Sequence, residues 1–240
     1  MKNLTYWFYQ PYKWIIVIPL FGIETVLCTL LILITAPFRT KIDGKIGEMW
    51  ANILRFIVPM RVEVIGKENI AKGESYIFAA NHQSAFDIIL IYGCLPAYFK
   101  WIMKEELRHA PVLGKACEKM NHIFIDRSSA RASYRSIQKA KEILTGGTSV
   151  VIFPEGTRSK TGKLLPFKSG AFKMAESLEL PIIPVTIDGT RNIMGPSIST
   201  LMPGKVRLVI HKPIDVKSYA ERHAELVEAT RNAIESGFNK

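Results

Sequence analysis

The strongest chemical signal in this sequence lies in the block Asn81-His82-Gln83-Ser84-Ala85-Phe86-Asp87. A carboxylate that binds one nitrogen of an imidazole fixes its tautomer and leaves the other nitrogen free to act as a general base. On a continuous helix, side chains five positions apart point about 140° away from each other. A pair of His82 and Asp87 therefore requires the histidine to lie in a loop and the aspartate in the first turn of the next helix. The apolar run at residues 76–80 predicts a strand that ends just before such a loop.

The same block has a second interpretation. Ser84 and Asp87 also fit the S-x-x-[DE] capping box, in which the carboxylate only stabilises the start of a helix. The block alone leaves both interpretations open. The other histidines do not combine a loop position with a nearby acid, so we expect packing or surface roles for them: His109, His122, His211 and His223.

A second polar block, Phe153-Pro154-Glu155-Gly156-Thr157-Arg158-Ser159, follows the apolar run at residues 149–153. Arg158 can bind a phosphate through two parallel hydrogen bonds, and Gly156 lets a ligand approach the backbone amides. Glu155 is expected to orient the arginine or a substrate hydroxyl. The alternative is an ordinary turn with a solvated charge pair. Arg127, after the apolar residues 123–125, has the same two interpretations.

Beyond residue 60, short β-rich segments alternate with helical ones, which is typical of an α/β fold. We predict strands at residues 61–66, 75–80, 122–127, 148–155, 181–189 and 205–214, and helices at 84–94, 111–120, 129–144, 167–178 and 218–236. The expected domain has a mostly parallel central sheet with flanking helices. Ligands in such sheets bind outside the carboxyl ends of the strands. Three predicted strand ends carry the polar blocks, so we expect them to form one site.

The N-terminal part of the chain contains a long apolar segment. Residues 14–38 carry a single charge, Glu24. As a helix they would extend roughly 37 Å, against about 30 Å for the hydrocarbon core of a bilayer. Lysines and arginines lie on both sides of the segment, so neither flank is marked as the translocated one. We expect a retained N-terminal helical membrane anchor at residues 1–60, either a one-leaflet pair or a single span, followed by an α/β domain at residues 61–240.

Composition narrows the possible partners. Lys and Arg outnumber Asp and Glu by 32 to 21, so the surface should attract anions such as phosphates or anionic lipids. Three cysteines far apart favour a reducing compartment over a disulfide framework. No metal site is expected, because the metal-ligand motifs are absent, and neither is a P-loop or a G-x-S-x-G nucleophile. No nucleic-acid partner is expected either, because the sequence has no signature of a nucleic-acid-binding fold.

Four blocks in a fixed order resemble those of the glycerolipid acyltransferase family, most closely its 1-acyl-sn-glycerol-3-phosphate acyltransferases, over roughly residues 66–214. The family's N-H-x-x-x-x-D block is similar to residues 81–87, and its other three blocks to residues 123–127, 153–159 and 180–185. Lys104 lies in a stretch that resembles the one ahead of the second block. Asn121 departs from the family pattern, which often has glycine there, and this puts the local turn in question.

This resemblance implies transfer of a fatty acyl chain from an acyl-CoA or acyl carrier protein thioester to the sn-2 hydroxyl of lysophosphatidic acid, giving phosphatidic acid. His82, held by Asp87, would be the general base. No cofactor is implied beyond the thioester co-substrate. An apolar tunnel for the acyl chain and a cell-membrane location, with the site on the cytoplasmic side, are also implied. The residues expected to bind the glycerol phosphate are Lys104, Arg127, Glu155, Gly156, Thr157 and Arg158.

The motifs leave the acceptor and the donor open. Another lysolipid or glycerol 3-phosphate is a possible acceptor, and the sequence does not choose between CoA and carrier protein or set an acyl chain length. A non-catalytic lipid-binding protein with the same basic pocket and anchor is the alternative from a different functional class.

Overall fold

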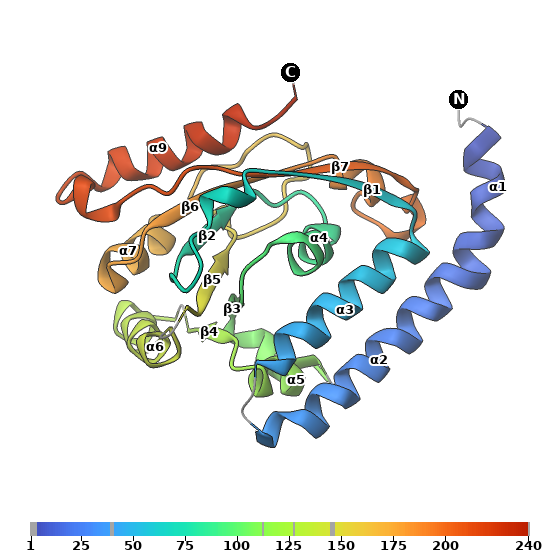
Figure 1. Ribbon diagram of the computed structural model, residues 1–240, viewed down its shortest axis with the longest axis horizontal. Coiled ribbons are helices and arrows are strands. Elements are labelled where there is room, and N and C mark those ends of the chain that lie inside the picture. Colours follow the sequence, from blue (N-terminus) through green and yellow to red (C-terminus); the bar gives the residue numbers. More distant parts are fainter. Residues whose placement is uncertain (1–3, 39–40, 112, 127, 145–146, 240) are drawn as a thin grey trace.

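The computed structural model describes residues 4–38, 41–111, 113–126, 128–144 and 147–239 (Figure 1). Strands in these ranges form one sheet in the order β1-β7-β6-β2-β5-β3-β4. Neighbouring strands are parallel except for the antiparallel pair of β6 and β7. The mostly parallel α/β fold predicted from the sequence is therefore confirmed. The strands are β1 Met60–Ile65, β2 Ile77–Ala80, β3 Phe99–Lys104, β4 Ile123–Ile125, β5 Ser149–Ile152, β6 Ile182–Asp188 and β7 Gly204–Ile210.

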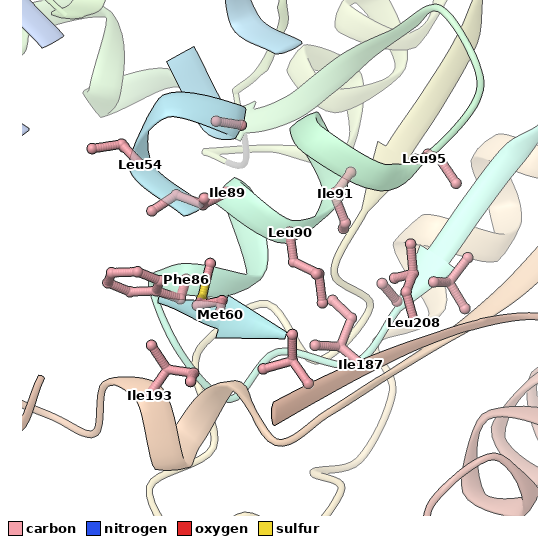
Figure 2. Packing of buried hydrophobic residues seen from close by; sticks show 14 of the residues in the cluster. Leu54, Met60, Phe86, Ile89, Leu90, Ile91, Leu95, Ile187, Ile193 and Leu208 are labelled. Carbon is pink, nitrogen blue, oxygen red and sulfur yellow. The ribbon is translucent and has the colours of Figure 1, made fainter. Parts of the chain in front are cut away.

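Side chains alternate between the two faces of the sheet, and helices cover each face. On one face Phe78 packs with helix α3 (Ile42–Ile57) and helix α4, and on the other Ile77 packs with α6, α7 and α9. Figure 2 shows the first of these layers, in which Leu90 of α4 lies over Ile187 of β6. The helices are α4 Phe86–Cys94, α5 Leu113–Lys119, α6 Ala130–Ile143, α7 Ser169–Leu178, α8 Thr190–Ile193 and α9 His223–Ser236.

The strand β3 lies outside the segments in which the sequence predicts a strand. Its Lys100 is buried, 3% exposed, on a strand that otherwise contributes Phe99 and Trp101 to the core. Lys100 Nζ lies 2.5 Å from Asp43 Oδ2 in the first turn of α3, and Tyr98 Oη donates to Asp43 Oδ1 at 2.8 Å. The partner that makes a buried lysine acceptable is 57 positions away, so local patterning does not reveal it.

The N-terminal helices form a hairpin that lies along the α/β domain (Figure 1). Helix α1 Leu4–Tyr12 continues through the π-helical turn Lys13–Val17 into α2 Ile18–Thr35, and α3 Ile42–Ile57 runs back beside α2. The wide turn precedes Pro19, whose ring would clash with a carbonyl four residues earlier in a regular helix. In the described residues, Tyr6–Thr35 is one helix long and apolar enough to cross a membrane, with a mean hydropathy of 2.5. Such a helix is consistent with membrane association.

Both ends of the hairpin contact the α/β domain. Near the start of α2, Lys13 Nζ donates to the Ser199 carbonyl at 2.7 Å. Near its end, Cys28 and Ile32 pack against α5 in a cluster with Met120. Many other apolar side chains of the hairpin remain exposed, among them Trp7, Phe8, Ile15, Leu27, Ile34 and Phe56. The hairpin thus has one face on the domain and a large apolar face that is free.

Candidate active site

The loop that carries His82 begins where β2 ends. Asn81 is fully buried, and its side-chain amide forms two hydrogen bonds of the kind that a backbone amide forms in a sheet. Asn81 Nδ2 donates to the Ile187 carbonyl at 2.8 Å, and Asn81 Oδ1 accepts from the Ile187 amide at 2.7 Å. These two bonds extend the pairing of β2 with β6 by one position, so the residue that follows enters the loop in a fixed direction.

His82 and Asp87 form the expected contact, with Nδ1 and Oδ2 2.7 Å apart. Asp87 has no exposed surface and lies in the first turn of α4. Its Oδ2 also accepts from the amides of Gln83 and Ser84, at 2.7 and 2.8 Å, and its Oδ1 accepts from Thr190 Oγ1 at 2.5 Å. The contacts expected from both interpretations of the sequence block are therefore present, because one carboxylate binds the histidine and the amides just before α4. Since Nδ1 is engaged, Nε2 is the nitrogen left for chemistry.

Residues of the second polar block, 153–159, form hydrogen bonds with the backbone of the first block, 81–87. Glu155 Oε1 accepts from the His82 amide at 2.8 Å, and its Oε2 accepts from the Leu165 amide at 2.9 Å. The Ser159 amide donates to the His82 carbonyl at 2.8 Å. Burial raises the pKa of the Glu155 carboxyl, and the two amide bonds oppose part of that rise. Both Glu155 oxygens thus bind backbone amides, a role that the sequence did not predict, and the expected role of Glu155 in orienting an arginine or a substrate hydroxyl stays a prediction.

Gly156 makes the turn after Glu155 possible. Its φ of +71° lies in the left-handed region, which glycine adopts without strain. A Cβ at this position would also lie 2.9 Å from Lys168 Nζ. Any other residue would therefore strain the turn and displace a lysine beside it.

A cavity of about 930 Å³ opens beside His82. Five polar-wall residues come from the end of β3, the loop after β5 and the position before α7: Lys104, Gly156, Thr157, Arg158 and Lys168. Four of these were predicted from the sequence. Lys168 was not, because it lies beyond the recognised block and only the fold brings it next to Gly156. Glu155 is not among the described residues on the wall, and Arg127 lies outside the described residues.

The rest of the cavity wall is apolar and comes mainly from α2, α3, α5 and β3. It includes Phe21 and Ile32 of α2, Trp50 of α3, and Met120 at the end of α5. Side chains of the N-terminal hairpin therefore complete a cavity that begins at the His82 loop. The sequence implied an apolar tunnel only through the family resemblance and identified none of these residues.

His122 lies on the same wall but has the packing role expected for it. Its Nδ1 accepts from the Trp101 amide at 3.2 Å, so Nε2 carries the proton and donates to Tyr92 Oη at 2.9 Å. Burial lowers the pKa of His122 to about 3, with a smaller contribution from the Lys100 charge. This histidine is therefore neutral near pH 7.

The turn before His122 contains Asn121, the departure from the family pattern. Asn121 has a φ of +54°, in the left-handed region that asparagine tolerates better than most residues with a Cβ. The next amide, of His122, donates to the Cys117 carbonyl at 3.0 Å and closes the helix end. Asparagine thus keeps the turn that glycine would make.

Comparison with known proteins assigns the chain to a family. A family model described as Acyltransferase matches residues 61–188, and the chain belongs to this family. The chain is 33% identical over 228 residues to a chloroplastic 1-acyl-sn-glycerol-3-phosphate acyltransferase of Brassica napus, a match that covers 91% of this chain and 64% of the relative. For a chloroplastic enzyme of the same name from Arabidopsis thaliana, the identity is 36%, with 76% and 51% of the two chains covered.

The fold also matches a solved structure. The crystal structure of the 1-acyl-sn-glycerophosphate (LPA) acyltransferase PlsC from Thermotoga maritima superposes with a TM-score of 0.77 at 30% identity, covering 99% of this chain and 97% of that one. The match therefore includes the N-terminal hairpin as well as the sheet. By contrast, the chain spans only about half to two thirds of the length of the two plant relatives.

Proposed function

We propose that this protein transfers a fatty acyl chain from a thioester to the sn-2 hydroxyl of lysophosphatidic acid, giving phosphatidic acid. The observation that carries the proposal is that His82, paired with the buried Asp87, lies on the wall of a cavity that has both cationic and apolar sides. The cationic side suits a phosphate, the histidine suits a hydroxyl that must lose its proton, and the apolar side suits a long acyl chain. The names of the relatives and of the solved structure agree with this substrate.

In the proposed reaction His82 Nε2 accepts the proton of the acceptor hydroxyl as its oxygen attacks the thioester carbonyl carbon. The new C–O bond forms a tetrahedral oxyanion, which then collapses with cleavage of the C–S bond. The thiolate leaves and takes the proton back from the imidazolium. Asp87 supports this cycle, because its buried carboxylate accepts from Nδ1 and stabilises the positive charge on the ring while the proton is held.

The phosphate of the acceptor is proposed to bind among Lys104, Arg158 and Lys168, which line the polar wall. Arg158 offers a planar fork for two phosphate oxygens, and the lysines supply point charges. The Thr157 hydroxyl and the backbone at Gly156 complete this surface. These groups bind a part of the substrate that does not change during the reaction, so they act on binding rather than on the chemical step.

The N-terminal hairpin is proposed to lie in one leaflet rather than to span the bilayer. A helix that spans the bilayer moves away from a domain in the aqueous phase and can contact it near one end only. Helix α2 instead contacts the α/β domain near its start, through Lys13 and Ser199, and near its end, through Ile32 and Met120. The free apolar face of the hairpin would enter the lipid while the domain stays at the surface. A protease-sensitive tag at the N-terminus of protein bound to sealed vesicles should be cleaved from the side that holds the domain. Protection of the tag would reject this topology.

The function is tested with purified protein in vesicles, labelled acyl-CoA or acyl carrier protein, and a panel of acceptors. We expect phosphatidic acid from lysophosphatidic acid, and none with His82→Ala that still binds vesicles. Preferred use of glycerol 3-phosphate or another lysolipid would overturn the assigned acceptor. No thioester consumption with any acceptor would reject the enzyme and leave a lipid-binding protein.

A further inference from the structure

Phe153, the residue between β5 and the Pro154-Glu155-Gly156 turn, lies face to face with His82. Their ring centroids are 3.9 Å apart and their planes differ by only 8°. Trp101 of β3 stacks in turn on Phe153, with centroids 5.4 Å apart and planes at 29°. All three rings lie on the cavity wall. They form a column from three neighbouring strands, since β5 lies between β2 and β3.

The hydrogen bond to Asp87 contacts the imidazole at one edge atom, Nδ1, and touches neither face of the ring. A flat aromatic face packed against the imidazole restricts rotation about the side-chain bonds of His82 and so adds to what the hydrogen bond holds. Phe153 can do this because it is itself held by Trp101, whose backbone amide donates to His122 Nδ1 at 3.2 Å and whose ring packs on Phe99, with centroids 5.6 Å apart.

We infer that Phe153 is a positioning residue for the general base: its ring fixes the plane of His82, so that Nε2 points at the acceptor hydroxyl, and stabilises the imidazolium. This inference rests on the proposed function. The face of an aromatic ring carries partial negative charge, and it attracts a cation more than a neutral group. The contact therefore strengthens as His82 takes the proton, which is when catalysis needs it.

Nearby charges also affect the stability of the His82 imidazolium, and the test must separate their effect from that of the Phe153 ring. Asp87 of α4 binds its Nδ1 and Glu155 binds its amide, and both oppose loss of the imidazolium. Lys104, Arg158 and Lys168 on the cavity wall act in the opposite sense. None of these is changed by a substitution at residue 153. His122, with a pKa of about 3, does not titrate in the range where His82 is followed.

The experiment compares Phe153→Leu, which keeps the apolar volume but removes the flat face, with Phe153→Tyr, which restores it. For Phe153→Leu we expect kcat to fall about 10-fold with little change in the acceptor KM. The acid limb of the kcat–pH profile should move down by about 0.5 to 1 pH unit, because the imidazolium is less stable. Phe153→Tyr should recover most of both. The matched control is Phe124→Leu, which changes a buried phenylalanine of β4 away from the cavity wall and should leave both quantities unchanged.

A second measurement does not depend on turnover. The chemical shift of ¹³C-labelled His82 Cε1, identified by its loss in His82→Ala, reports the ring's titration directly. Trifluorophenylalanine at residue 153 keeps the shape of the ring while reducing the negative charge of its face, so the pKa of His82 should fall without loss of fold. An unchanged His82 titration and an unchanged kcat in an active enzyme would overturn the inference. A wild-type protein that consumes no thioester would instead reject the proposed function.

Discussion

Two substitutions at Asp87 separate its two roles, which the sequence could not distinguish. In Asp87→Asn, the amide oxygen can still accept from His82 Nδ1 and from the amides of Gln83 and Ser84. The new amide group can donate to the hydroxyl of Thr190, which now accepts a bond in place of donating one. The start of α4 and the tautomer of His82 are therefore retained. What is lost is the negative charge opposite the imidazolium.

The size of that loss can be bracketed. Hydrogen bonds to a charged group contribute about 1.5–3 kcal/mol against about 1 for neutral partners, so the lower limit is about 1 kcal/mol. Two charges about 4 Å apart at an effective dielectric constant near 20 interact by about 4 kcal/mol, which is the upper limit. Converted to rates, kcat of Asp87→Asn should fall by between about 5-fold and 10³-fold. The melting temperature should change little.

Asp87→Ala tests the other role. It leaves the amide of Ser84 and the hydroxyl of Thr190, both fully buried, without an acceptor. Each such group costs about 1–3 kcal/mol, so the free energy of unfolding should fall by roughly 2–6 kcal/mol. The assays are thioester consumption with a thiol reagent and thermal unfolding by circular dichroism in the same detergent. An Asp87→Asn enzyme with the wild-type kcat would refute the charge argument and reduce Asp87 to a residue that only caps a helix.

Three further predictions concern the surrounding residues. Lys168→Ala and Arg158→Ala should each raise the acceptor KM about 10-fold or more at nearly constant kcat, measured by steady-state kinetics; an unchanged KM in either would remove that residue from the phosphate site. Glu155→Gln places an NH₂ group against the amide of His82 or of Leu165, so we expect kcat to fall and the protein to lose about 1–3 kcal/mol of stability while KM holds, and a raised KM at full kcat would contradict it. The pKa of His122 is lowered to about 3 in the folded state, so below about pH 6.5 the unfolded chain binds a proton that the native protein does not. The free energy of unfolding should therefore decrease as the pH falls from about 6.5 to 3, by up to about 1.4 kcal/mol per pH unit. This slope, measured by denaturant unfolding at several pH values, should be smaller in His122→Gln.

The sequence predicted those parts of the site that lie on one short segment. His82 and Asp87 are five positions apart, and Ser84, whose amide also donates to Asp87, is part of the same block, so local spacing was enough to propose these contacts. The predicted parallel sheet implied that the ends of β2, β4 and β5 would form one site, and the loops after β2 and β5 do contact each other. Both expectations depend on periodicity and turn chemistry, which act over a few residues.

What the sequence did not reveal depends on distant partners. Thr190 binds Asp87 across 103 positions, and Asp43 makes Lys100 acceptable in the core across 57. The sequence offered two roles for Glu155, a contact with an arginine or the substrate and a solvated charge pair, and neither includes the backbone amides that it binds. Its burial against the backbone of the His82 loop is a tertiary contact over 73 positions. The apolar wall of the cavity likewise forms only when the hairpin packs on α5.

The strand order explains why the base lies in the loop after β2. This strand has β6 on one side and β5 on the other. From the β6 side, Ile187 holds the side chain of Asn81 and Thr190 holds the carboxylate of Asp87. From the β5 side come the ring against His82 and the carboxylate that binds its amide. A loop at the edge of the sheet would have one such neighbour, and a histidine there would keep freedom that a general base cannot have. The central position therefore supplies rigidity that neither the loop nor its helix provides alone.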